Sequence, residues 1–181
     1  MSDIRLFIDA DACPVKDEVY KVARRYRLHV YVVSNSFMMI PKDPLIERVI
    51  VDAGPDVADD WIAEQCKPGD IVVTADIPLA ARCLENKALV LKSNGQPFTP
   101  DSIGSALAGR AIGEHLRSMG EITRGPPPFG PADRSRFLQA LDEAVHRGRK
   151  AALAERGRPW FARATMPFAQ PPVTPTSRGA R

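Results

Sequence analysis

Residues 6–16 read LFIDADACPVK, and this stretch decides the fold. Leu6, Phe7 and Ile8 form a short apolar run typical of a buried strand, which an Asp-Ala-Asp-Ala segment closes. Pro14 follows where a helix can begin, because a proline in the first turn loses no hydrogen bond. The stretch therefore predicts a buried strand that leads directly into a helix.

The same alternation of strand and helix continues along the chain. Apolar residues at helical spacing predict a helix over residues 15–26. Apolar, β-branched runs predict strands at residues 30–33, 48–51, 71–73 and 89–91, with helical stretches after residues 56 and 78. This order predicts an α/β fold, a Rossmann-like three-layer sandwich with a mostly parallel five-stranded sheet.

The character of the sequence changes after Gly95. Helices are expected around residues 103–111 and 137–145, joined by a Pro/Gly-rich hinge at residues 125–131. We therefore assign residues 1–149 to one domain and residues 150–181 to a basic Pro- and Arg-rich tail, expected to be largely disordered.

Charge is distributed unevenly between these two parts. Residues 1–145 carry 17 Lys and Arg against 21 Asp and Glu, whereas residues 146–181 carry eight against one. A basic tail is a weak indication of nucleic-acid binding, and a solubilising end is an equally good interpretation.

The composition indicates a cytoplasmic protein rather than a membrane or secreted one. No apolar run approaches the roughly 20 residues that a membrane helix needs, and the N-terminus lacks the pattern of a signal peptide. Three cysteines without C-x-x-C spacing argue against a disulfide framework and a zinc knuckle. The oligomeric state cannot be read from the sequence.

Acidic residues fall at three comparable places in the predicted sheet. Asp9 and Asp11 follow the first strand, Asp76 follows the fourth, and Asp59 and Asp60 lie in the helix after the third. Ligands of an open parallel sheet bind at the carboxyl ends of its strands, so these acids are expected to converge. Converging carboxylates repel one another, and Mg²⁺ or Mn²⁺ would compensate that repulsion.

Spacing suggests which of these acids point into the site. Asp11 would share the side of Asp9 if the backbone stayed extended. At 100° per residue, Asp59 lies next to the buried side of its helix and Asp60 on the exposed side. Asp9, Asp11 and Asp59 are therefore metal-ligand candidates, with Asp60 in reserve.

Helix capping is the alternative role for such acids. Asp56 is expected to be a plain N-cap. A carboxylate directly after a buried strand seldom has a structural role, so Asp76 is a candidate catalytic and metal-binding residue, like Asp9 and Asp59. Asn35 and Thr74, near the ends of the second and fourth strands, are secondary candidates that could orient a phosphate.

Basic residues supply the expected contacts to phosphate or nucleic acid. Exposed arginines usually only solvate a surface, but the cluster at residues 133–136 is suggestive. Cys13 is interpreted as a small packing residue, because no histidine forms a convincing pair with it. The phosphate-binding candidates are Lys16, Arg82, Arg110, Arg134 and Arg136.

Four segments, at residues 9–16, 54–62, 74–80 and 133–137, resemble the YaiI/YqxD family of uncharacterised bacterial proteins. The resemblance covers roughly residues 4–148. That family is regarded as a distant branch of the PIN-like superfamily. The resemblance therefore implies a Rossmann-like sheet and a Mg²⁺- or Mn²⁺-dependent nuclease site, carried over onto Asp9, Asp59 and Asp76.

Three classes of function remain open at this point. The leading hypothesis is metal-dependent hydrolysis of a phosphodiester in nucleic acid, with RNA as the expected substrate, at one or two metals and with Asp11 as a helper. The sequence leaves the choice between RNA and DNA open. The Asp-x-Asp pattern at Asp9 also fits a haloacid-dehalogenase-like phosphatase, in which the first Asp is the nucleophile. The third class is a non-catalytic module that binds nucleic acid or a protein partner.

Overall fold

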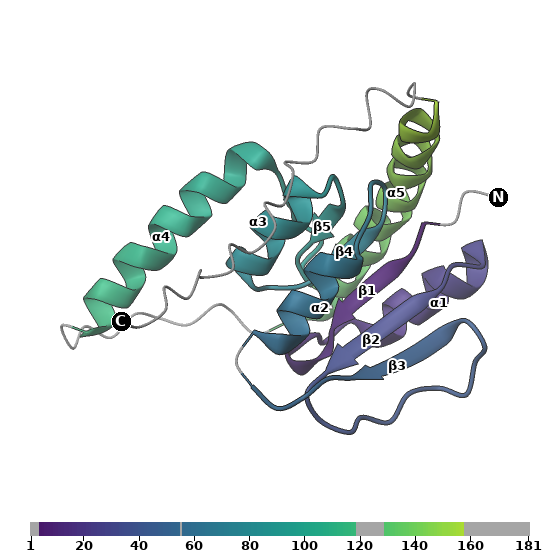
Figure 1. The fold of residues 1–181 in the computed structure, drawn as a ribbon, viewed down its shortest axis with the longest axis horizontal. Helices are drawn as coiled ribbons and strands as arrows, with labels where there is room; N and C mark the ends of the chain where they lie inside the picture. Colours follow the sequence, from purple (N-terminus) through teal and green to yellow (C-terminus); the bar gives the residue numbers. More distant parts are fainter. Residues whose placement is uncertain (1–3, 55, 119–128, 158–181) are drawn as a thin grey trace, which may run out of the picture.

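A mixed sheet lies between two layers of helices in the computed structural model, which describes residues 4–54, 56–118 and 129–157 (Figure 1). The described strands are β1 (Leu6–Asp9), β2 (Val30–Ser34), β3 (Ile46–Ile50), β4 (Ile71–Val73), β5 (Leu89–Leu91) and β6 (Pro97–Phe98). The described helices are α1 (Lys16–Tyr26), α2 (Val57–Gln65), α3 (Ile77–Glu85), α4 (Pro100–Ser118) and α5 (Pro131–Arg156). A 3₁₀ turn, η1 (Ala10–Ala12), separates β1 from α1.

The strand order is β3-β2-β1-β4-β5-β6, and neighbouring strands from β3 to β5 are parallel. This confirms the predicted Rossmann-like, mostly parallel sheet. The predicted number of five strands was too low, because β6 returns antiparallel to β5 after a turn at Gly95. Two residues are too few to show a strand periodicity in sequence.

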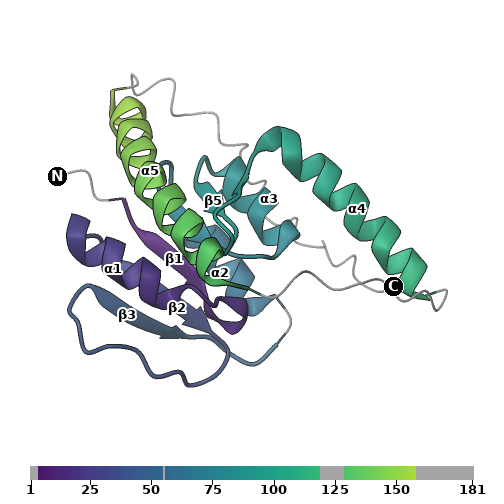
Figure 2. The same cartoon turned by 180° about the vertical axis from the view of Figure 1, so that it is seen from behind.

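The two faces of the sheet are covered by different helices (Figure 2). Leu6 and Ile8 of β1 pack in one hydrophobic cluster with residues of α1 and α5. Phe7 points to the other face and packs in a second cluster with residues of α2 and α3. Side chains alternate between the two faces along a strand. A residue two positions from Phe7 in β1 therefore also faces α2 and α3.

Helix α5 is longer than the sequence predicted. A side chain at Gly148 would collide with the backbone oxygen of Gly69, so two glycines allow α5 to pass close to the turn before β4. The helix continues to Arg156, and residues 150–156, assigned above to the tail, are therefore helical. Residues 158–181 of the predicted tail lie outside the described residues.

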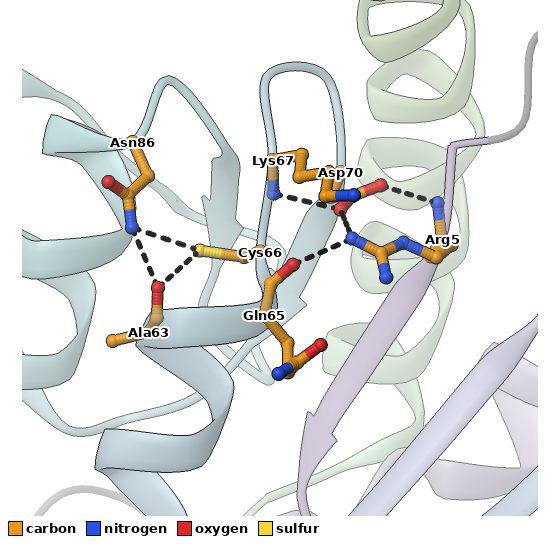
Figure 3. Close-up of polar contacts among 7 residues, drawn as sticks. All are labelled: Arg5, Ala63, Gln65, Cys66, Lys67, Asp70 and Asn86. Carbon is orange, nitrogen blue, oxygen red and sulfur yellow. Dashed lines mark hydrogen bonds and ion pairs between the residues drawn. The ribbon is translucent and has the colours of Figure 1, made fainter. Parts of the chain in front are cut away.

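A buried acid fixes the edge of the sheet at which the parallel strands β1 and β4 begin (Figure 3). Asp70, only 2% exposed, accepts hydrogen bonds from the backbone N–H groups of Arg5 and Lys67. The Arg5 guanidinium donates to Asp70 at 2.6 Å and to the Gln65 carbonyl at 2.7 Å. Asp70 therefore has a structural role, tying the start of β1 to the turn before β4.

Across the described part of the chain, no helix combines the length and the apolar character needed to cross a bilayer.

Candidate functional site

The candidate site lies where the strand order reverses, between β1 and β4. In open α/β sheets this switch point leaves a crevice outside the carboxyl ends of the two strands. Asp9 is the last residue of β1, two residues beyond Phe7, so alternation directs it to the face covered by α2 and α3. The Thr74 hydroxyl, directly after β4, donates a 3.0 Å hydrogen bond to Oδ2 of Asp9.

Thr74 and Asp76 together begin helix α3. The N–H of Asp76 donates to the Thr74 hydroxyl oxygen at 2.9 Å, and Oδ1 of Asp76 accepts from the N–H of Leu79 at 2.9 Å. Asp76 is therefore the N-cap of α3, which corrects the expectation that an acid after a buried strand has no structural role. Its position beside Asp9 is still compatible with a functional role.

The carboxylates of this site repel one another. The pKa of Asp59 is raised to about 6, first because burial disfavours its charge and then because Asp76 and Asp9 are negative. The pKa of Asp9 is also raised, mainly by burial; the Thr74 hydrogen bond lowers it, while Asp11 and Asp76 raise it. Three acids that are distant in sequence, Asp9, Asp59 and Asp76, are thus close enough to influence one another.

The helical spacing of α2 correctly separated its two acids. Asp59 is half-buried, while Asp60 is exposed. Asp60 instead accepts a 2.7 Å hydrogen bond from the Arg82 guanidinium of α3. Arg82 also lowers the pKa of Asp59, so this cation, a predicted phosphate contact, lies at the border of the site.

Two other acids differ from expectation. The chain turns into η1 directly after Asp9, so the backbone does not stay extended and Asp11 is exposed. Asp56 occupies the N-cap position of α2, but its backbone is left-handed (φ 62°) and its side chain makes no capping hydrogen bond. The prediction that Asp56 is a plain N-cap was therefore wrong.

Within the part of the chain that the structure describes, no three Asp, Glu, His or Cys side chains are already arranged to hold a metal ion. Metal binding by Asp9, Asp11, Asp59 and Asp76 stays a prediction.

Lys16 is the basic candidate nearest to the end of β1. Its ammonium group donates to the carbonyl of Ala10 at 3.2 Å, directly after Asp9. Asn35, just past β2, is exposed. Cys13 is buried, which raises its thiol pKa to about 11, and this confirms its interpretation as a packing residue.

The cluster at residues 133–136 is largely used for structure. Oδ2 of Asp133 accepts from the N–H of Gly130 at the start of α5, and Arg136 pairs with Asp133 on an exposed face. Arg134 donates at 2.9 Å to the buried Glu18 of α1, an ion pair that the sequence did not reveal. A phosphate would have to compete with Glu18 for Arg134. The side chain of Arg110 lies outside the described residues.

Comparison with known proteins gives a family and close relatives. A family model described as "Uncharacterized BCR, YaiI/YqxD family" matches residues 7–147. A "UPF0178 protein" of Caulobacter sp. (strain K31) is 66% identical over 145 residues, covering 80% of this chain and 96% of the relative. A "UPF0178 protein" of Rhodopseudomonas palustris (strain ATCC BAA-98 / CGA009) is 60% identical over 143 residues, covering 79% and 90%. No solved structure matches the chain.

Proposed function

The chain belongs to the YaiI/YqxD family of uncharacterised proteins. We propose that it is a metal-dependent phosphodiesterase that cleaves nucleic acid, with RNA as the expected substrate. The observation that carries this proposal is the convergence of Asp9, Asp59 and Asp76 at the β1–β4 switch point. Burial is the first cause that raises the pKa of Asp59 to about 6, and the negative charges of Asp76 and Asp9 raise it further. A carboxyl group whose pKa is raised by burial together with specific neighbouring charges is a candidate for a functional site.

The donor set fits a hard divalent cation. All three acids offer carboxylate oxygens, which are the ligands that Mg²⁺ and Mn²⁺ prefer. Asp9, Asp59 and Asp76 would hold Mg²⁺ or Mn²⁺, with Asp11 as a fourth candidate from its exposed position beside them. When bound there, the cation would offset phosphate charge and lower the pKa of a water molecule.

The protein's own groups have separate roles in this proposal. Thr74 positions the carboxylate of Asp9 through its hydroxyl, as outer groups orient metal ligands in other sites. Lys16, whose ammonium donates to the carbonyl of Ala10 directly after Asp9, would contact a phosphate oxygen. Arg82 and the basic tail would add contacts to the strand's other phosphates, giving salt-sensitive binding with little sequence readout.

A PIN-like ancestry, implied by the resemblance, belongs to the same proposal. It is supported by the parallel order β3-β2-β1-β4-β5 and by acids that follow β1 and β4. We also propose a cytoplasmic location, consistent with three free cysteines, all buried.

The test is cleavage of a labelled single-stranded RNA by the purified chain. Cleavage is expected in Mn²⁺ or Mg²⁺, none in EDTA, and none by Asp9→Asn in either. Asp101→Asn, which neutralises an exposed acid of α4, is the matched control and should cleave like the wild type. If the correctly folded wild type leaves the RNA intact in every metal, the catalytic proposal is wrong. The chain would then be a non-catalytic module that binds nucleic acid or a protein partner.

The phosphatase alternative is favoured by one observation. The hydroxyl of Thr74 and the ammonium group of Lys16 lie close to the end of β1. A phosphatase with Asp9 as its nucleophile would need such groups to bind the phosphate. p-Nitrophenyl phosphate should therefore be assayed beside RNA. Turnover of this monoester that Asp9→Asn abolishes, with RNA left intact, would favour the phosphatase.

A further inference from the structure

Two of the three cysteines lie together between α2 and α3. Cys66 is the C-cap of α2 and Cys83 lies near the end of α3, and both are buried in the same hydrophobic cluster. The Asn86 amide at the end of α3 donates to the Ala63 carbonyl of α2 at 2.7 Å and to Sγ of Cys66 at 3.7 Å (Figure 3). Cys83 precedes Asn86 by three residues, so both side chains lie on the face of α3 that meets α2. The two thiols therefore face each other.

The two thiols also influence each other's ionisation. A hydrogen bond from the Cys83 thiol lowers the pKa of Cys66; burial opposes this effect, and the Asn86 amide adds to it. The same hydrogen bond, together with burial, raises the pKa of Cys83. Because the thiolate is the nucleophilic form of a cysteine, Cys66 is the thiol of this pair that reacts first, while Cys83 keeps its proton.

The third cysteine provides a comparison within the same chain. Cys13 is 7% exposed, against 5% for Cys66 and none for Cys83. It lies in the hydrophobic cluster on the other face of the sheet, so the sheet separates it from both other thiols. Burial raises the pKa of Cys13 to about 11, so it stays protonated at neutral pH. Exposure alone would make Cys13 at least as reactive as Cys66, whereas ionisation favours Cys66.

We propose that Cys66 and Cys83 are a reversible dithiol–disulfide pair that a peroxide oxidises. The Cys66 thiolate attacks one oxygen of hydrogen peroxide and the O–O bond breaks, which leaves a sulfenic acid on Cys66. The departing hydroxide takes up the proton that Cys66 has lost. The Cys83 sulfur then attacks the Cys66 sulfur, its proton joins the leaving hydroxyl group, and the S–S bond forms. Two thiols and one peroxide thus give one disulfide and two water molecules, and a thiol reductant reverses the oxidation.

The disulfide joins the two helices that carry acids of the candidate site. Asp59 precedes Cys66 by seven residues, and Asp76 precedes Cys83 by seven. Seven residues are about two helical turns, so each cysteine lies roughly 10 Å along its helix from the acid and on the same side. Oxidation therefore restrains the separation of α2 and α3 below the acids. Formation of the bond does not require that the acids bind a metal.

Thiol mapping of the full chain in EDTA tests the pair without any metal. The reduced protein is treated with hydrogen peroxide, the remaining thiols are alkylated in denaturant, and the peptides are identified by mass spectrometry. We expect the loss of two of the three alkylatable thiols, with one linked pair of peptides that contains Cys66 and Cys83. Cys13 is the matched control and should be alkylated as in untreated protein. All three cysteines should be alkylated again after treatment with a thiol reductant.

Two variants test the order of the steps. Cys83→Ala should hold the sulfenic acid on Cys66, where dimedone labels it, and Cys66→Ala should leave Cys83 reduced. If either variant fails to fold, the map of the wild type decides alone. Three thiols that remain alkylatable after peroxide overturn the proposal, as does oxidation of Cys13 at the rate of Cys66 or a disulfide between two copies of the chain. None of these results depends on cleavage of RNA, so the proposed hydrolysis stands or fails separately.

Discussion

The Thr74 hydroxyl lies 3.0 Å from Oδ2 of Asp9 and joins the carboxyl ends of β1 and β4. The same oxygen accepts from the N–H of Asp76, so one buried hydroxyl serves both acids. Thr74 is only 3% exposed, which excludes solvent as a replacement partner. The orientation of Asp9 and the start of α3 are therefore coupled through one side chain.

Thr74→Val keeps the shape of this side chain and removes its hydroxyl. We expect a loss of about 1–3 kcal/mol of unfolding free energy, since the buried N–H of Asp76 and the Asp9 carboxylate lose their partner. The pKa of Asp9 should rise further, because the Thr74 hydrogen bond lowers it. Denaturant unfolding and an NMR titration of the carboxyls measure both effects. Thr74→Ser is the control and should restore most of the stability and the pKa.

Asp59→Asn should stabilise the metal-free protein. The raised pKa of Asp59 means that its charge is unfavourable in the folded state, and neutralisation removes that cost. After allowance for solvent screening we expect a gain of about 1–2 kcal/mol, or roughly 2–6 °C in melting temperature. The same substitution should abolish the stabilisation that Mn²⁺ gives the wild type, about 2.7 kcal/mol at a hundredfold excess over Kd. A lower melting temperature in EDTA would assign Asp59 a structural role instead.

The raised pKa of Asp59 also predicts a direction for stability against pH. The folded-state pKa, about 6, exceeds the ordinary aspartate pKa of 3.8, so the folded state binds the proton more tightly. The free-energy cost of the charged Asp59 in the folded state is therefore fully present above pH 6. This cost is relieved as the pH falls from about 6 towards 4. In EDTA, the difference in unfolding free energy between Asp59→Asn and the wild type should shrink over this range. A difference that stays constant from pH 8 to pH 4 would contradict the raised pKa.

Asp76 requires two substitutions because it caps α3. Asn is as good an N-cap as Asp, so Asp76→Asn should change the apo stability little, whereas Asp76→Ala should cost about 1 kcal/mol. If Asp76 is also a metal ligand, both variants lose the response of the melting temperature to Mn²⁺. If Asp76→Asn retains the full shift of the melting temperature in Mn²⁺, Asp76 caps α3 and does not bind the metal.

Deletion of residues 158–181 tests the basic tail. This segment carries four arginines and no acid, and it begins after the end of α5, whose Gly148 and Ala152 pack against Gly69. The truncated protein should melt like the full chain but bind RNA more weakly, with a shallower slope of log affinity against log salt. An unchanged slope would show that the tail does not contact the phosphates of RNA, and would leave it a role in solubility.

Local sequence patterns predicted the identity of most elements. Short apolar runs placed β1, β2, β4 and β5 within a residue or two, and spacing on α2 separated the half-buried Asp59 from the exposed Asp60. Such patterns succeed because they report which side of a single element is buried, and this depends on residues close together in the chain. They failed for β6, which is too short, and for the length of α5.

The partners of the functional groups were decided only by the tertiary structure. Thr74 and Asp9 are 65 residues apart, and Glu18 and Arg134 are 116 apart, so strand register and helix packing bring them together. The same holds for Asp76, whose capping of α3 depends on the backbone conformation at the end of β4. The sequence by itself determined a parallel α/β sheet with acids at its carboxyl edge, since burial periodicity is a local property and the alternation of strands with helices favours parallel crossovers. Which oxygen faces which donor depends on atoms positioned by distant segments, and no local pattern encodes that.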